Sequence, residues 1–126
     1  MQLSLPADPS TPAAARTALE GDRLSVPARL VPDLQLLVSE LVTNSVRHAD
    51  LAPGQRIELR VTSRPGTVRV EVEDPGPGFT PTPRRPGDRR DDGWGLFLVE
   101  RIADRWGVAN GSPAVVWFEI DWRTDS

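Results

Sequence analysis

Apolar and polar residues alternate along two stretches in the middle of the chain, residues 56–62 and 67–73. In both, every second residue is isoleucine, leucine or valine, which is the period of a β-strand with one buried face. The segment between them, Arg64-Pro65-Gly66, has the composition of a tight turn. The pattern therefore predicts a β-hairpin, and a similar alternation over residues 114–122 predicts a strand near the end of the chain.

Two other stretches, residues 32–49 and 95–106, place their apolar residues three or four positions apart, which is the period of an amphipathic helix. A helix is also predicted over about residues 11–24, because a serine or threonine can cap it and a proline suits its first turn. Helices combined with hairpin strands favour an α+β fold. We expect a two-layer sandwich of about three helices on a mostly antiparallel, mixed sheet.

Length and composition narrow the kind of protein further. The 126 residues are expected to form one domain, residues 1–126, and 38% of them are apolar. No stretch approaches the ~18 apolar residues that a membrane span needs, and residues 1–10 show no export signal. We therefore expect a cytoplasmic protein without membrane contact. The net charge of −3 argues against nucleic acid as a direct partner.

The basic residues exclude several common chemistries. All 15 are arginine, and the chain contains no lysine. A Walker-type phosphate loop, a eukaryotic-type kinase site and a Schiff-base enzyme each need a lysine, so all three are excluded. With no cysteine and a single histidine, a thiolate or histidine-rich zinc site is excluded as well.

The helix predicted over residues 32–49 carries polar groups spaced by about one turn. Glu40, Asn44 and His48 lie four residues apart and stack along one edge, with Arg47 beside them. The Asn44 carbonyl suits a hard cation such as Mg²⁺, whose shell is otherwise filled by phosphates and waters. Glu40 could accept a proton from a hydroxyl, and Arg47 and His48 could face phosphates. The alternative is an ordinary polar helix face.

Asp74 lies at the end of the second hairpin strand. It shares the parity of the inward valines of that strand, so its carboxylate should point toward the apolar interior and need a hydrogen-bond donor. Gly76 and Gly78 follow and permit a close backbone approach. An exocyclic amino group such as that of adenine would satisfy the acid. The alternative is a turn-forming aspartate that accepts hydrogen bonds from nearby backbone amides.

A pair of glycines opens the last predicted helix, in Gly93-Trp94-Gly95-Leu96. The free amides of a helix N-terminus bind phosphate, and glycines let the backbone approach it. The preceding loop, about residues 79–92, is rich in proline, glycine, arginine and aspartate and could close over a ligand. The alternatives are a flexible helix start and a solvated loop whose arginines are balanced by aspartates.

Taken together, these residues resemble the ATP-binding domain shared by gyrase, the Hsp90 chaperones, histidine kinases and MutL, known as the Bergerat fold. Glu40-x-x-x-Asn44 resembles the N box of that family, and Asp74-x-Gly76-x-Gly78 resembles its first glycine box. Gly93-x-Gly95-Leu96 resembles its second glycine box. The glutamate at position 40, the run over residues 40–49 and the short length are most similar to the anti-sigma factor serine kinases of the SpoIIAB and RsbW type.

The resemblance implies binding of ATP and Mg²⁺. It implies that Asn44 is the metal ligand, Glu40 the catalytic base and Asp74 the partner of the adenine amino group. Gly76 and Gly78 would hinge an ATP lid of about residues 79–92. The resemblance and the chemistry above assign contact with the nucleotide to the remaining residues: Arg47, His48, Gly93, Trp94, Gly95 and Leu96.

The resemblance further implies serine kinase activity toward a small anti-anti-sigma (STAS-type) partner, sequestration of a sigma factor, and a homodimer. The chain departs from the family pattern in one place. Residues 111–116 contain no threonine, where the family often has one that supports adenine recognition. This departure motivates a second hypothesis, a catalytically weak or inactive nucleotide-sensing module that sequesters a transcriptional regulator.

Overall fold

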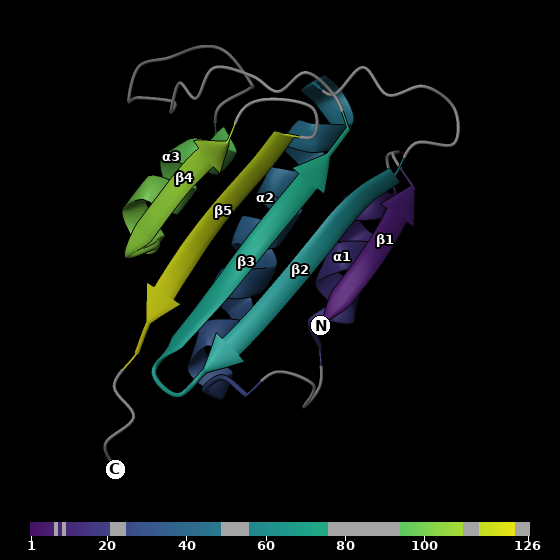
Figure 1. Ribbon diagram of the computed structural model, residues 1–126. Helices are drawn as coiled ribbons and strands as arrows, with labels where there is room; N and C mark the ends of the chain where they lie inside the picture. The colour runs from purple at the N-terminus through teal and green to yellow at the C-terminus, as the bar shows by residue number, and fades with distance from the viewer. Residues whose placement is uncertain are drawn as a thin grey trace.

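The computed structural model describes residues 1–6, 8, 10–20, 25–48, 56–75, 94–109 and 114–122. For residues 47–48 and 94–97 it describes the backbone alone. Five strands of this part of the chain form one sheet in the order β1-β2-β3-β5-β4, antiparallel at every pairing (Figure 1). The strands are β1 (Gln2–Pro6), β2 (Arg56–Arg64), β3 (Thr67–Asp74), β4 (Arg105–Ala109) and β5 (Ala114–Asp121).

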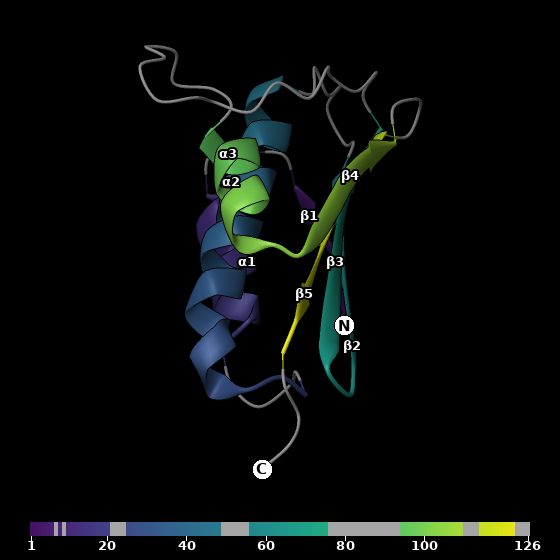
Figure 2. The same ribbon diagram turned by 90° about the vertical axis from the view of Figure 1, so that its left-hand side faces the viewer.

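The helices of the described residues all lie on one face of this sheet, and the other face is left open (Figure 2). They are α1 (Thr11–Ala18), the short 3-10 helix η1 (Ala28–Leu30), α2 (Val31–His48) and α3 (Trp94–Ile102). This arrangement confirms the expected two-layer α+β sandwich. Within the described ranges, no helix is long and apolar enough to cross a membrane.

The hydrophobic core fills the space between the helix layer and the sheet. The alternating positions of the strands supply one side of it, since Ile57, Val70 and Phe118 are each fully buried. The helical period supplies the other side, because the apolar stripe of α2 faces the sheet. The stripe residues are 0–2% exposed: Leu34, Leu37, Val38, Leu41 and Val42.

The predicted hairpin is confirmed, with β2 and β3 paired from Glu58↔Glu73 to Arg64↔Thr67. The turn between the strands requires a glycine, because Gly66 has a φ of 89°, a conformation that side-chain-bearing residues rarely adopt. The Gly66 carbonyl also accepts a hydrogen bond of 2.9 Å from the backbone N–H of Trp122. The turn is therefore joined to the end of β5.

The prediction of a helix over residues 95–106 is wrong at its C-terminal end. The last helical hydrogen bond runs from the Ala103 N–H to the Val99 carbonyl, and the next N–H, of Asp104, donates to the Glu119 carbonyl of β5. The Asp104 carboxylate also accepts a 2.6 Å hydrogen bond from the Asp121 N–H. These long-range bonds end the helix, and the chain turns back as β4 along the edge of the sheet.

Two differences concern the start of the chain. The helix predicted to about residue 24 ends at Ala18, where the N–H groups of Leu19 and Glu20 bond to carbonyls only three residues back. Residues 21–24 lie outside the described part of the chain. Strand β1 was not predicted, because its alternation of Leu3 and Leu5 with polar neighbours spans too few residues to be distinctive.

Of the three tryptophans whose side chains the structure describes, two contact the core and one, Trp117, lies on the open face of the sheet. Trp106 and Trp122 pack, half-buried, against the core. Trp117 has the opposite parity and lies on the open face, where the Arg69 guanidinium carbon is 4.2 Å from its ring centre. Gly107 makes room for this ring, because a Cβ there would come within 2.8 Å of the indole nitrogen.

Candidate functional site

The predicted site residues are carried by elements that meet at one end of the molecule. β3 ends there at Asp74, α2 ends there at His48, and both β5 and α3 begin there (Figures 1 and 2). Helices α2 and α3 also pack against one another, and α2 packs on β3. Residues from three distant parts of the sequence are thus brought to a common edge of the sandwich.

Asp74 is buried, with 4% of its surface exposed, as its strand parity predicted. Its carboxylate faces the helix layer, where Oδ2 accepts a hydrogen bond of 3.4 Å from the hydroxyl of Ser45 on α2. Burial of a carboxylate is costly unless donors surround it. The position therefore suits an acid that takes a hydrogen bond from a ligand as well as from the protein.

Sequence reasoning missed Ser45. It is 3% exposed and lies four residues after Leu41 and three after Val42, within the apolar stripe of α2. A hydroxyl at a stripe position needs a partner in the core, and that partner is Asp74. The polar residue interrupting the stripe was the signal that could have identified it.

Asn44 is 7% exposed, and its side-chain amide makes no hydrogen bond to any other described residue. Buried amides in proteins are nearly always paired, because leaving one unpaired costs about 1–3 kcal/mol. The next residue of α2, Ser45, bonds to Asp74, so Asn44 lies in the turn of the helix that meets the end of β3. An unsatisfied carbonyl oxygen at this place fits a cation such as Mg²⁺ arriving with a ligand.

Glu40 lies one turn before Asn44 on the same helix, about 6 Å along the axis, and is half-buried. Within the described ranges, no three histidine, cysteine, aspartate or glutamate side chains converge on a point. A magnesium ion at this end would therefore take Asn44 as its protein ligand and complete its shell with phosphates and waters.

The remaining predicted residues are described in part or not at all. Arg47 and His48 form the last turn of α2, and Trp94, Gly95 and Leu96 form the first turn of α3, with only their backbones described. The first turn of α3 leaves backbone N–H groups without helical partners, as a phosphate site requires. Gly76, Gly78, Gly93 and the predicted lid over residues 79–92 lie outside the described part of the chain.

Strand β5, which pairs with β3 beside Asp74, includes part of the segment without threonine, residues 111–116. Ala114 is the residue directly paired with Asp74, and it is buried. Its methyl group offers no hydrogen bond to the acid or to a ligand beside it.

Comparison with known proteins gives a consistent result. Residues 5–119 match the family model for the histidine kinase-like ATPase domain. The serine-protein kinase RsbW of Oceanobacillus iheyensis is 30% identical over 127 residues, covering 87% of this chain and 78% of the relative. The serine-protein kinase RsbW of Listeria monocytogenes serovar 1/2a is 32% identical over 116 residues, covering 81% and 74%.

A solved structure supports the fold independently. The histidine kinase domain of a blue-light activated histidine kinase from Erythrobacter litoralis superposes with a TM-score of 0.62 at 24% identity. The match covers 87% of this chain and 58% of that one. The chain therefore belongs to the histidine kinase-like ATPase family, the Bergerat fold, and within that family it is close to the RsbW serine-protein kinases.

Proposed function

We propose that this protein binds Mg²⁺ and ATP between α2, β3 and α3 and transfers the γ-phosphoryl group to a serine of a partner protein. The observation that carries the proposal is the buried amide of Asn44, without a partner among the described residues, on the helix turn whose Ser45 bonds to the buried carboxylate of Asp74. A ligand with a cation at one end and an amino-bearing base at the other would satisfy both groups. The similarity to two serine-protein kinases supports the choice of ATP.

The roles follow from where each element ends. Asp74, beside Ser45, would accept a hydrogen bond from the adenine amino group. Asn44 would hold the magnesium ion, which supplies charge neutralisation at the phosphates when bound. The first turn of α3, with Trp94, Gly95 and Leu96, would donate backbone N–H groups to the phosphates. Arg47 and His48, and the glycines Gly76, Gly78 and Gly93, would complete the pocket and its lid.

The transfer step needs a base for the incoming hydroxyl. Glu40 would accept the proton of the serine hydroxyl as its oxygen bonds to the γ-phosphorus, and the bond to the β-phosphate oxygen breaks to release ADP. Positioning and charge stabilisation account for most of the rate in such transfers. The lack of lysine fits this design, since helix amides and a metal ion replace a cationic side chain.

We further propose that the partner is a small anti-anti-sigma protein of the STAS type and that the protein also sequesters a sigma factor, working as a homodimer. This proposal rests on the resemblance of the chain to the anti-sigma factor kinases, and the similarity to two serine-protein kinases named RsbW supports it. Phosphorylation adds negative charge to the partner's serine, which is sufficient to break a packed interface. Control of sigma factor release would follow from that change.

Transfer of ³²P from ATP to a cognate anti-anti-sigma protein tests the kinase proposal. Glu40→Gln should keep Mg-ATP affinity and reduce transfer by at least about 100-fold, as expected for loss of a general base. Asp33→Asn, in the first turn of the same helix, is the matched control and should retain full transfer. Equal transfer by the unmodified protein and by Glu40→Gln would refute the assignment of Glu40.

A second function is favoured by the pairing of Asp74 with Ala114. With a methyl group at this position, adenine recognition has one polar contact fewer, and turnover is more sensitive to that loss than binding is. The protein would then be a nucleotide-sensing module that sequesters a regulator without phosphorylating it. Calorimetric binding of Mg-ATP together with absence of transfer to every cognate partner would favour this function.

A further inference from the structure

The open face of the sheet carries a continuous set of ion pairs. Arg60 pairs with Glu73 at 2.6 Å, and Arg105 pairs with Glu119 at 2.7 Å and with Asp121 at 2.6 Å. These pairs join neighbouring strands across β2, β3, β5 and β4. Most of the basic side chains on this face are therefore already neutralised by carboxylates.

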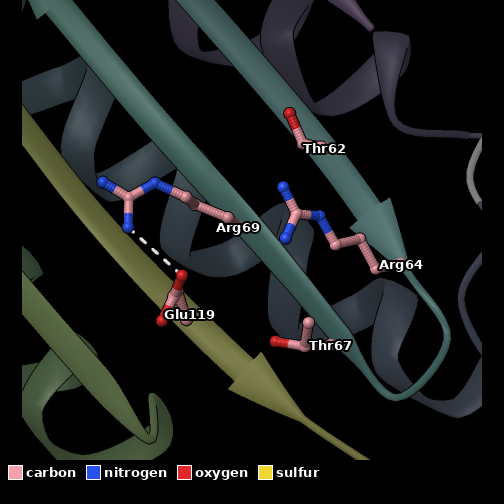
Figure 3. A pocket seen from close by; sticks show the side chains of 5 residues that line it. All are labelled: Thr62, Arg64, Thr67, Arg69 and Glu119. Atoms are coloured by element: carbon pink, nitrogen blue, oxygen red, sulfur yellow. Dashed lines mark hydrogen bonds and ion pairs between the residues drawn. The ribbon is translucent and has the colours of Figure 1, made fainter.

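A small pocket lies on this face near the β2–β3 turn, and it encloses about 160 Å³ (Figure 3). Two strands of the hairpin and β5 line it with polar or charged residues, whose carbon stems form part of its surface: Thr62, Arg64, Thr67, Arg69 and Glu119. The pocket is at the opposite end of β3 from Asp74, seven residues or about 23 Å along an extended strand. It is therefore separate from the proposed nucleotide site.

The pairing register explains how the lining is arranged. Arg64 is directly opposite Thr67, and Thr62 is directly opposite Arg69, so arginines and threonines occupy alternate corners of a square. All four side chains have the parity of the open face. Two arginines and two threonines thus line the same small space. The Thr67 hydroxyl already donates a hydrogen bond of 3.4 Å to the Ile120 carbonyl, whereas Thr62 and Arg64 are exposed.

The two arginines differ in their surroundings. Arg69 is held in place, because it stacks on Trp117 and pairs with Glu119 at 3.2 Å and with Glu71 at 3.5 Å. The exposed side chain of Arg64 has no hydrogen bond or ion pair with any other described residue. Figure 3 shows the Arg64 guanidinium on the β2 side of β3, and the Arg69 guanidinium on the β5 side, turned toward Glu119.

Glu119 is the single carboxylate of the lining, and it is already occupied. Arg105 and Arg69 both donate to it, and these hydrogen bonds, the one from Arg105 above all, lower the pKa of its carboxyl. One negative charge among two positive ones leaves the lining with a net charge of +1. The excess positive charge belongs to Arg64.

We propose that this pocket binds a phosphate group, with Arg64 as the principal ligand and the Thr62 hydroxyl as a further donor. A phosphate has at least three terminal oxygens, so it can accept from the Arg64 guanidinium with two of them and from the Thr62 hydroxyl with another, which a carboxylate with two oxygens cannot do. A guanidinium fork suits such oxygens bidentately. The phosphate can be free inorganic phosphate or one carried by a phosphorylated side chain, since both present the same oxygens.

Titration followed by ¹H–¹⁵N NMR tests the proposal, with inorganic phosphate, phosphoserine and acetate as separate probes at matched ionic strength. Phosphate should shift the amides of residues 62–69, and acetate should not. A stronger response to phosphoserine than to inorganic phosphate would identify a phosphorylated side chain as the source, and the reverse would identify the free ion. Equal shifts with acetate would overturn the choice of phosphate.

Arg64→Gln should weaken phosphate binding by about ten-fold or more, the loss expected for a charge-assisted hydrogen bond. Arg16→Gln removes the same charge from an exposed position on α1, in the helix layer on the other face, and should leave the affinity unchanged. Thr62→Val keeps the shape and removes one donor, so it should weaken binding by a smaller factor. Unchanged affinity in Arg64→Gln, or equal losses in Arg64→Gln and Arg16→Gln, would overturn the proposal.

Discussion

The Ser45 hydroxyl donates a hydrogen bond to the Asp74 carboxylate, with 3.4 Å between Ser45 Oγ and Asp74 Oδ2. This contact joins the last turn of α2 to the last residue of β3, so the helix and the sheet meet at the point where the proposed nucleotide would sit. Both residues are buried, and the bond is therefore screened little by water. The pair positions the acid for a ligand.

Replacement of Asp74 by asparagine should weaken Mg-ATP binding by about ten- to 100-fold, because a charged acceptor for the adenine amino group is lost. Isothermal titration calorimetry measures the change. The matched control is Glu73→Gln, which removes a carboxylate from the adjacent residue of the same strand on the opposite face. Equal affinities in Asp74→Asn and in Glu73→Gln would contradict the adenine assignment.

Asn44→Leu should abolish the contribution of Mg²⁺ to ATP affinity and yet leave the ligand-free protein as stable as before, or more stable. The amide is buried without a partner among the described residues, so its removal costs no hydrogen bond. Ser45→Ala provides the contrast, because it deprives Asp74 of a donor and should lower the stability by about 1 kcal/mol. Thermal unfolding without nucleotide compares the two variants. A similar fall in melting temperature for both would show that Asn44 has a structural partner.

Gly107→Ala should destabilise the protein by about 1–3 kcal/mol, because the added methyl group would lie 2.8 Å from the Trp117 indole nitrogen. Urea denaturation measures the loss. In the double variant Gly107→Ala with Trp117→Leu, the clash is removed. Its loss of unfolding free energy should therefore be smaller than the sum of the losses in the two single variants. Strictly additive effects would mean that the strand shifts to accommodate the methyl group without contact with the ring.

Stability should fall in acid as the ion pairs of the open face are lost. The pKa of Glu119 is lowered by hydrogen bonds from Arg105 and Arg69, and that of Asp121 is lowered chiefly by Arg105. A lowered folded-state pKa stabilises the protein above the ordinary value, 4.5 for the glutamate, and this contribution disappears as the pH falls through the folded-state pKa.

Glu119→Gln should therefore reduce the melting temperature near neutral pH, and its curve should converge with that of the unmodified protein in acid. Arg105→Gln removes the main cause of both shifts and should act in the same direction. Melting temperatures measured across the acid range test this expectation. A constant difference between the curves at every pH would show that the loss arises from packing and not from the ion pairs.

Much of the fold was predictable because its signals are local. The period of two over residues 56–62 and 67–73 predicted the hairpin, and the helical period predicted the buried stripe of α2. Strand parity alone placed Asp74 inside, next to the inward valines. The match of three motifs in order indicated the family, which the comparisons confirm.

Other features depend on contacts between distant residues. Trp106 follows a helical pattern, yet the bond from the Asp104 N–H to Glu119 ends the helix and makes Trp106 part of β4. Trp117 has a large apolar side chain of the kind usually found in a core, yet pairing in the sheet places it on the open face, under Arg69. The hydrophobicity of a tryptophan could not predict whether it lies in a helix or a strand, or on which face of the sheet. It indicates only that the side chain tends to be covered by other residues.

The sequence by itself determined the hairpin, the amphipathic helices, the inward acid and the exclusion of lysine-dependent chemistry, since each depends on residue type and on periods within one segment. Only the tertiary structure decided the strand order, the partnership of Ser45 with Asp74, the burial of the Asn44 amide away from any described partner, and the pocket beside Arg64. Those relationships arise when the sheet pairs and the helix layer packs on it, which places groups from separate segments within hydrogen-bond distance.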